Sequence, residues 1–116
     1  MIITTTPSIE GKCITDYLAI VSGQAIMGAD LIRDILENVH EIVGGSSGAY
    51  EEALKKARKI ALQEVADEAR RFGADAVVGL DINYEVLGAA GAMLMVSANG
   101  TAVRIEDNDP KHLLLT

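Results

Sequence analysis

Three side chains with oxygen donors recur at every second position in one stretch of the sequence: Asp81, Asn83 and Glu85. Apolar or aromatic residues alternate with them, a pattern that is typical of a half-buried β-strand. Because successive side chains of a strand point to opposite faces, the three would project from one face. A concentrated set of oxygen donors suits Ca²⁺ or Mg²⁺. We favour the simpler interpretation, a solvated sheet face, because one-sided polar strands are ordinary.

Sulfur donors for a soft metal are scarce. Met93 and Met95 share one face of a predicted strand, and Cys13, the only cysteine, lies on another predicted strand that could approach them. Thioether and thiolate groups select soft metals, yet the sequence has no Cys-x-x-Cys and no His pair at ligand spacing. The interpretation that we favour is that the methionines fill core or interface gaps and that Cys13 is a small buried hydrophobe.

A glycine- and serine-rich turn precedes a predicted helix, and its members Gly45, Ser46, Ser47 and Gly48 could bind an anion. Glycines expose backbone N–H groups, and a helix N-terminus attracts negative charge. The turn is not a P-loop, because the Gly-Lys-Ser/Thr ending is missing. A tight helix–helix turn that needs positive φ explains the same residues and is favoured. No nucleophilic or acid–base set emerges, so no catalytic residue is assigned.

Two helices are predicted between these candidate sites. From 29 to 43 apolar residues recur at spacings of three and four, which predicts an amphipathic helix. The second helix, predicted from about 49 to 72, follows the Gly-Ser turn, and Gly73 is expected to end it. The apolar positions of the first helix are Leu31, Ile32, Ile35, Leu36, Val39, Ile42 and Val43.

The second helix carries an unusual face. Three alanines mark one side of it, and charged residues project within or beside that side. Small residues allow close approach of another helix or sheet, so this face is a candidate subunit contact. The charges would then form ion pairs between subunits or line a ligand site, or they are simply solvated where the helix protrudes. The residues of this candidate contact are Ala53, Ala57, Ala61, Glu64, Glu68 and Arg71.

The strands complete an α+β fold. Strands are predicted at 2–5, 13–22, 76–86 and 93–104, and the last two form a hairpin around Gly88–Gly91. The order β-β-α-α-β-β predicts an antiparallel sheet with two helices on one face. We expect a single domain over residues 1–105 and a polar, loose tail over 106–116.

Composition points to assembly and away from several partners. Hydrophobic residues make up 49% of the 116 residues but aromatics only 3%, so a thin core of small side chains favours burial against another subunit. A net charge of −7 argues against nucleic acid and anionic membranes. No apolar run could span a bilayer, and no signal peptide is evident. A single cysteine excludes an intrachain disulfide, and a cytoplasmic location is expected.

Several blocks of sequence recur together in one known family. They include Thr5-Thr6-Pro7, Gly28-Ala29-Asp30, Val43 to Glu51, Gly73 to Gly79 and Met93 to Ser97. From about Ile3 to Val103 the chain resembles the YbjQ family, whose members are called "putative heavy-metal-binding proteins". The resemblance implies a dodecin-like α+β subunit in a homopentameric ring. It implies no activity, identifies no metal ligands and does not extend to residues 106–116.

These observations favour a non-enzymatic, self-assembling binding or scaffold protein whose main partner is itself. A divalent or soft metal held by the ring is a second hypothesis. The alternative from another class is a small-anion binder or enzyme that uses the turn at Gly44–Gly48.

Overall fold

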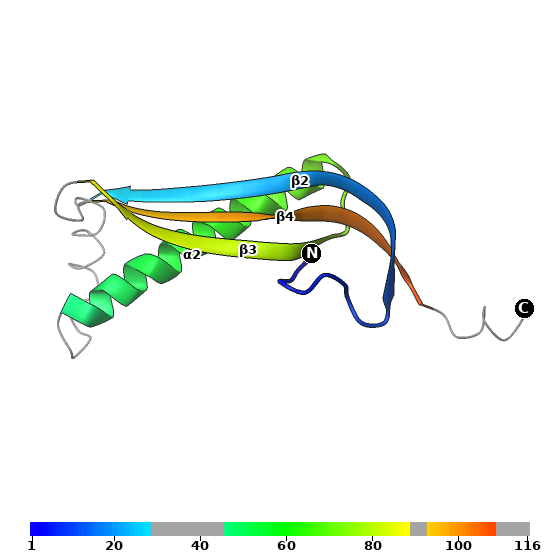
Figure 1. Ribbon diagram of the computed structural model, residues 1–116, viewed down its shortest axis with the longest axis horizontal. Coiled ribbons are helices and arrows are strands. Elements are labelled where there is room, and N and C mark those ends of the chain that lie inside the picture. The colour runs from blue at the N-terminus through cyan, green and yellow to red at the C-terminus, as the bar shows by residue number, and fades with distance from the viewer. Residues whose placement is uncertain (29–45, 89–92, 109–116) are drawn as a thin grey trace, which may run out of the picture. The chain divides into compact units, whose positions relative to one another are not determined.

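The computed structural model describes residues 1–28, 46–88 and 93–108. They form four strands and a long helix (Figure 1), so the fold is α+β as predicted. The elements are β1 (Ile2–Ile3), β2 (Lys12–Gly28), α2 (Ser46–Arg71), β3 (Ala76–Leu87) and β4 (Met93–Asp107). The helix predicted at 29–43 lies outside the described residues, and so does the turn at 89–92. The full β-β-α-α-β-β order therefore stays a prediction.

The sheet is mixed, which corrects the prediction of a purely antiparallel one. Its order is β1-β3-β4-β2, and β1 runs parallel to β3 with Ile2 opposite Ala76 and Ile3 opposite Val77. Parallel neighbours need a long crossover, and the chain between β1 and β3, which includes α2, supplies it. The strands β3 and β4 follow each other along the chain and lie side by side at the centre of the sheet (Figure 1).

The strand β2 is longer than the predicted 13–22, because Gly23 does not end it. From Val21 onward buried and exposed residues alternate strictly, and Val21, Ala25 and Met27 lie on the buried side. This is the pattern of a strand with one covered face. A glycine inside a strand often marks a close approach of another backbone. That is the case for Gly23, where an added Cβ would lie 2.1 Å from the carbonyl oxygen of Ala61 in α2.

The described residues fall into two compact units, and each long element contributes to both. Unit 1 draws on Met1–Val21, Ala66–Asp81 and Asn99–Thr116, and unit 2 on Ser22–Val65 and Ile82–Ala98. In unit 1, Ala76, Val78 and Val103 form a buried cluster against which Ile9, Ile14 and Ile105 pack.

Backbone hydrogen bonds fasten the N-terminal segment to β3 within unit 1. The N–H of Thr4 donates to the carbonyl of Val77 (2.9 Å), and the N–H of Leu80 donates to the carbonyl of Thr4 (3.0 Å). The N–H of Gly79 donates to the carbonyl of Thr6 at 2.9 Å. These bonds continue the pairing with β3 beyond the C-terminal end of β1. They hold the N-terminal segment in place although β1 itself has only two residues.

The helix α2 ends where the sequence predicts. Gly73 has a φ of 74°, and its N–H donates to the carbonyl of Arg70 (3.0 Å). Helices often end at a residue with positive φ. Glycine adopts this conformation without the steric cost that a side chain brings. Arg70 and Arg71 in the last turn favour the negative end of the helix dipole.

Candidate functional site

The predicted row of oxygen donors is exposed. Asp81, Asn83 and Glu85 all lie on β3 with exposed side chains, and Asp81 and Asn83 each already take part in an interaction within the chain. Tyr84 and Val86, which alternate with this row, are exposed as well. Side chains on both faces of this part of β3 are therefore exposed. The alternating pattern predicts one buried face and one solvated face.

The donor set for a heavy metal does not fit a metal site among the described residues. Within ranges 1–28, 46–88 and 93–108, no three His, Cys, Asp or Glu side chains come together in a way that could hold a metal ion. Cys13 is exposed, so it is not the buried hydrophobe that we favoured. Met93 is partly exposed and Met95 is half-buried, and the two share a strand as predicted.

The predicted anion site is described only in part. The helix α2 begins at Ser46, a few residues earlier than predicted, so Ser46, Ser47 and Gly48 lie in its first turn. Gly45 lies outside the described residues. The anion site therefore stays a prediction.

The alanine face of α2 contacts its own chain. Ala53, Ala57 and Ala61 have 0% of their surface exposed. The close approach of Ala61 to Gly23 places this face against β2 within unit 2. The alanines are already covered, so they have no surface to offer a second subunit, and the predicted contact through them needs correction. Small side chains serve here to bring a helix close to a strand of the same molecule.

The charges beside the alanines have different environments. Glu64 Oε2 accepts a hydrogen bond of 2.9 Å from the backbone N–H of Gln24 in β2, within unit 2. In unit 1, Glu68 is half-buried and has an interaction of its own, while Arg71 is exposed. The charge of Glu64 near a buried face is thus explained by its bond to a backbone N–H of β2, which is an edge strand in the sheet of the described residues. Sequence spacing could not show this, because the partner is a backbone group.

Sequence reasoning missed a groove in unit 2, which we call the α2 groove. It has a volume of about 400 Å³. Four of its residues recur along one face of the helix, and the others come from the ends of two strands. The α2 groove is lined by Glu51, Leu54, Lys55 and Arg58 of α2, Tyr84 and Val86 of β3, and Leu94 of β4.

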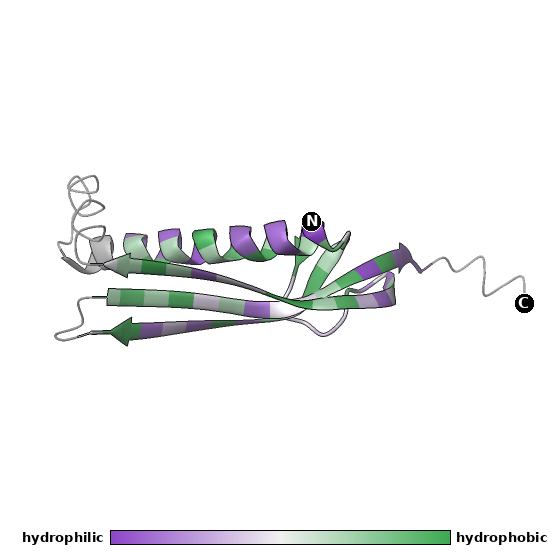
Figure 2. Cartoon of the chain, turned by 90° about the horizontal axis from the view of Figure 1, so that it is seen from above, coloured by the Kyte–Doolittle hydropathy of each residue, from purple (hydrophilic) through white to green (hydrophobic). Residues whose placement is uncertain are grey.

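Large apolar side chains are exposed on the strands as well. On β2, Tyr17 and Ile20 are 72% and 80% exposed in unit 1, and Ile26 is 51% exposed in unit 2. In Figure 2, hydrophobic residues colour the last residues of β2 and β3 and the first residues of β4. Single exposed apolar side chains are ordinary, but Ile20 and Ile26 share one face of the same strand.

A comparison with protein families decides the relationship of the chain. A family model for YbjQ proteins, described as "putative heavy-metal-binding", matches residues 1–106. The chain belongs to the YbjQ family. No function is established by that description, and it names no ligand residues.

A solved structure resembles this YbjQ chain in fold. It is a protein of unknown function from Pediococcus pentosaceus ATCC 25745 that belongs to the DUF74 family. The two are 23% identical with a TM-score of 0.50, and the match covers 91% of this chain and 98% of the other. At this identity the likeness supports the fold alone. Among the described residues, no helix is both long and apolar enough to cross a membrane.

Proposed function

We propose that this YbjQ protein is a non-enzymatic binding module that works as a homo-oligomer. The observation that carries the proposal is the character of β2. It is an edge strand in the sheet of the described residues, and from Tyr17 to Gly28 it has no charged side chain. Natural proteins usually protect such edges with Lys, Pro or a bulge, because an open edge pairs with other chains.

The exposed side chains of β2 support the same proposal. Ile20 and Ile26 alternate with the buried positions of the strand and are 80% and 51% exposed. Covering them in a subunit contact would remove apolar surface from water at roughly 25 cal/mol per Å². Glu64 accepts a hydrogen bond from the N–H of Gln24 on this strand, and backbone groups of a strand edge are what a second chain pairs with in strand addition.

A ring of five subunits is the arrangement that the family resemblance implies, and we adopt it as part of the proposal. Closed rings form when head-to-tail contacts repeat by a fixed rotation. An edge strand that meets a different surface of the next subunit is a contact of that kind. The heavy metal in the family's description is not part of the proposal, because the described residues provide no donor set for it.

Light scattering coupled to size exclusion at micromolar concentration tests the proposal. The expected mass is five times the subunit mass of 12.3 kDa. The variants Ile20→Lys and Ile26→Lys should shift the mass toward a single subunit, because a buried unpaired charge is costly at an interface. As the matched control, Asp16→Lys introduces the same side chain on β2 outside the uncharged stretch and should keep the wild-type mass. A wild-type protein that elutes at 12.3 kDa would refute the assembly.

A further inference from the structure

We propose that the α2 groove binds a small molecule with an apolar body and a carboxylate head. The inference rests on the binding part of the proposed function and not on the number of subunits. The groove lies wholly within unit 2, so each subunit carries a complete copy of it.

The walls of the groove suit an apolar body. Three of its lining residues come from the strands: Leu94 of β4 is only 2% exposed, while Tyr84 and Val86 of β3 are 47% and 60% exposed. Leu54 of α2, which also lines the groove, is half-buried. The volume of about 400 Å³ falls within the range of small-molecule sites, which are typically lined by apolar and aromatic side chains with a few polar groups.

The rim of the groove suits a negative head. Glu51, Lys55 and Arg58 are spaced by four and three residues, so they lie along one face of α2 with two cations toward the same end. The chain as a whole has a net charge of −7, so a rim with more cations than acids departs from the rest of the molecule. Charge complementarity therefore favours an anionic head group at this rim.

Arg58 is the residue best placed to bind the head group. The residues three and four positions from it on α2 are Leu54, Lys55, Ala61 and Leu62, so no acid of its own helix neutralises it. Lys55 makes a long contact with Glu52, 3.9 Å between Nζ and Oε1, and both side chains are exposed. Such a pair is weak and can be exchanged for a ligand. A guanidinium presents paired N–H donors that match a carboxylate.

Calorimetry with decanoate tests the inference on the protein in its native assembly, well below the concentration at which decanoate forms micelles. We expect saturable binding of one decanoate per subunit and weaker binding of 1-decanol, which has the same chain without the charge. Arg58→Gln should weaken decanoate binding about 3- to 10-fold and leave 1-decanol unchanged. Lys59→Gln, on the same helix but outside the groove, is the control and should change neither. Val86→Trp should fill the groove and abolish binding of both.

Four results would overturn the inference. The first is the absence of saturable decanoate binding up to about 1 mM. The second is a Val86→Trp variant that binds decanoate as the wild type does, and the third is a Lys59→Gln variant as impaired as Arg58→Gln. The fourth is dissociation of the assembly by decanoate in light scattering, because a second subunit would then be the natural occupant. A monomeric protein that binds decanoate through Arg58 would refute the assembly and leave this inference standing.

Discussion

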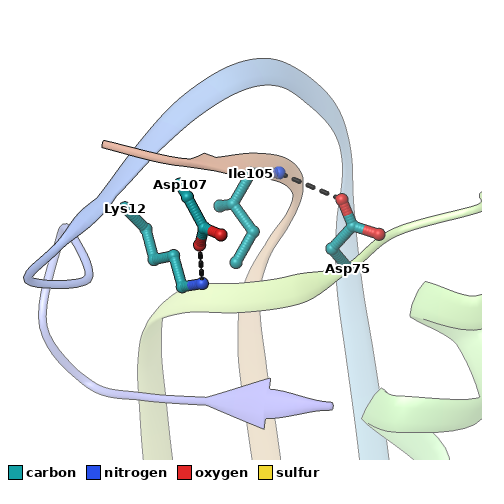
Figure 3. Close-up of polar contacts among 4 residues, drawn as sticks. All are labelled: Lys12, Asp75, Ile105 and Asp107. Atoms are coloured by element: carbon teal, nitrogen blue, oxygen red, sulfur yellow. Dashed lines mark hydrogen bonds and ion pairs between the residues drawn. The ribbon is translucent and has the colours of Figure 1, made fainter. Parts of the chain in front are cut away.

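At the scale of single residues, two carboxylates hold the strands of unit 1 together (Figure 3). Asp75 Oδ2 accepts a hydrogen bond from the N–H of Ile105 (3.1 Å), while its own N–H donates to the carbonyl of Val103 (2.9 Å). Asp107, at the end of β4, pairs with the ammonium of Lys12 at the start of β2. The side chain of Asp75 thus extends the backbone bonding of β4, and Asp107 links the ends of two neighbouring strands.

The pair between Lys12 and Asp107 makes a prediction about pH. The hydrogen bond from Lys12, and then its charge, hold the pKa of Asp107 below its ordinary value of 3.8. A depressed pKa means that the stabilisation is fully present above pH 3.8 and is lost as the pH falls through the folded-state pKa. An NMR titration of the Asp107 carboxyl carbon should show the depression. Lys12→Met should return the pKa to its ordinary range, and an unchanged titration in that variant would contradict the assignment.

Single residues also show where sequence reasoning stops. Gly73 was predicted to end α2 and does, because a helix terminus is decided by neighbouring positions. The bond from Gln24 to Glu64 was not predictable, because it joins a side chain to a backbone N–H in a distant element. The metal and anion candidates stay predictions, because residue type alone does not fix which side chains meet.

At the scale of elements, α2 and β2 approach each other closely in unit 2 because the residues between them have small side chains or none. Ala53, Ala57 and Ala61 are fully buried, and Gly23 lies directly under the backbone of α2. Periodicity located α2 and its alanine face, but it ended β2 at residue 22, just before the contact residue Gly23. It assigned that face to another subunit, because a stripe of small residues looks the same whether its partner is in the same chain or in another.

Substitution of Gly23 tests this contact. In Gly23→Ala the new Cβ would lie 2.1 Å from the Ala61 carbonyl oxygen and 2.9 Å from the Glu64 Cβ, so the helix must shift. We expect the free energy of unfolding to fall by about 1–3 kcal/mol in urea denaturation. Gly28→Ala, on the same strand but with nothing within 4 Å of its new Cβ, is the matched control and should be nearly neutral. Equal stability of the two variants would show that α2 does not pack on Gly23.

At the scale of the whole molecule, the α+β class and the family were predictable, and the arrangement of the sheet was not. Strand and helix patterns are local, so the positions of α2, β3 and β4 followed from them. The parallel pairing of β1 with β3 depends on residues far apart in the sequence, and two residues of strand carry little pattern. The family match covers residues 1–106 but leaves the ligand to experiment.

The heavy metal in the family's description is tested on the whole assembly. Among residues 1–28, 46–88 and 93–108 no three His, Cys, Asp or Glu side chains come together, and soft metals need several thiolate, thioether or imidazole ligands, so we expect these described residues to form no site that binds Zn²⁺ or Cu(I) tighter than about 10 µM in calorimetry. Ca²⁺ should likewise give no tight binding. Stoichiometric zinc that survives dialysis and disappears in Cys13→Ser would contradict this expectation and identify the thiolate as a ligand.

The parallel pairing of β1 and β3 has a consequence for synthesis on the ribosome. Ile2 and Ile3 pair with Ala76 and Val77, so the N-terminal segment has no partner until β3 has left the exit tunnel. Contacts between distant positions also close a long loop, which slows folding. Throughout that interval Ile2 and Ile3 are open to chaperones. A bulky fusion partner placed directly before Met1 would therefore be expected to hinder the pairing of β1 with β3 more than one placed after residue 116.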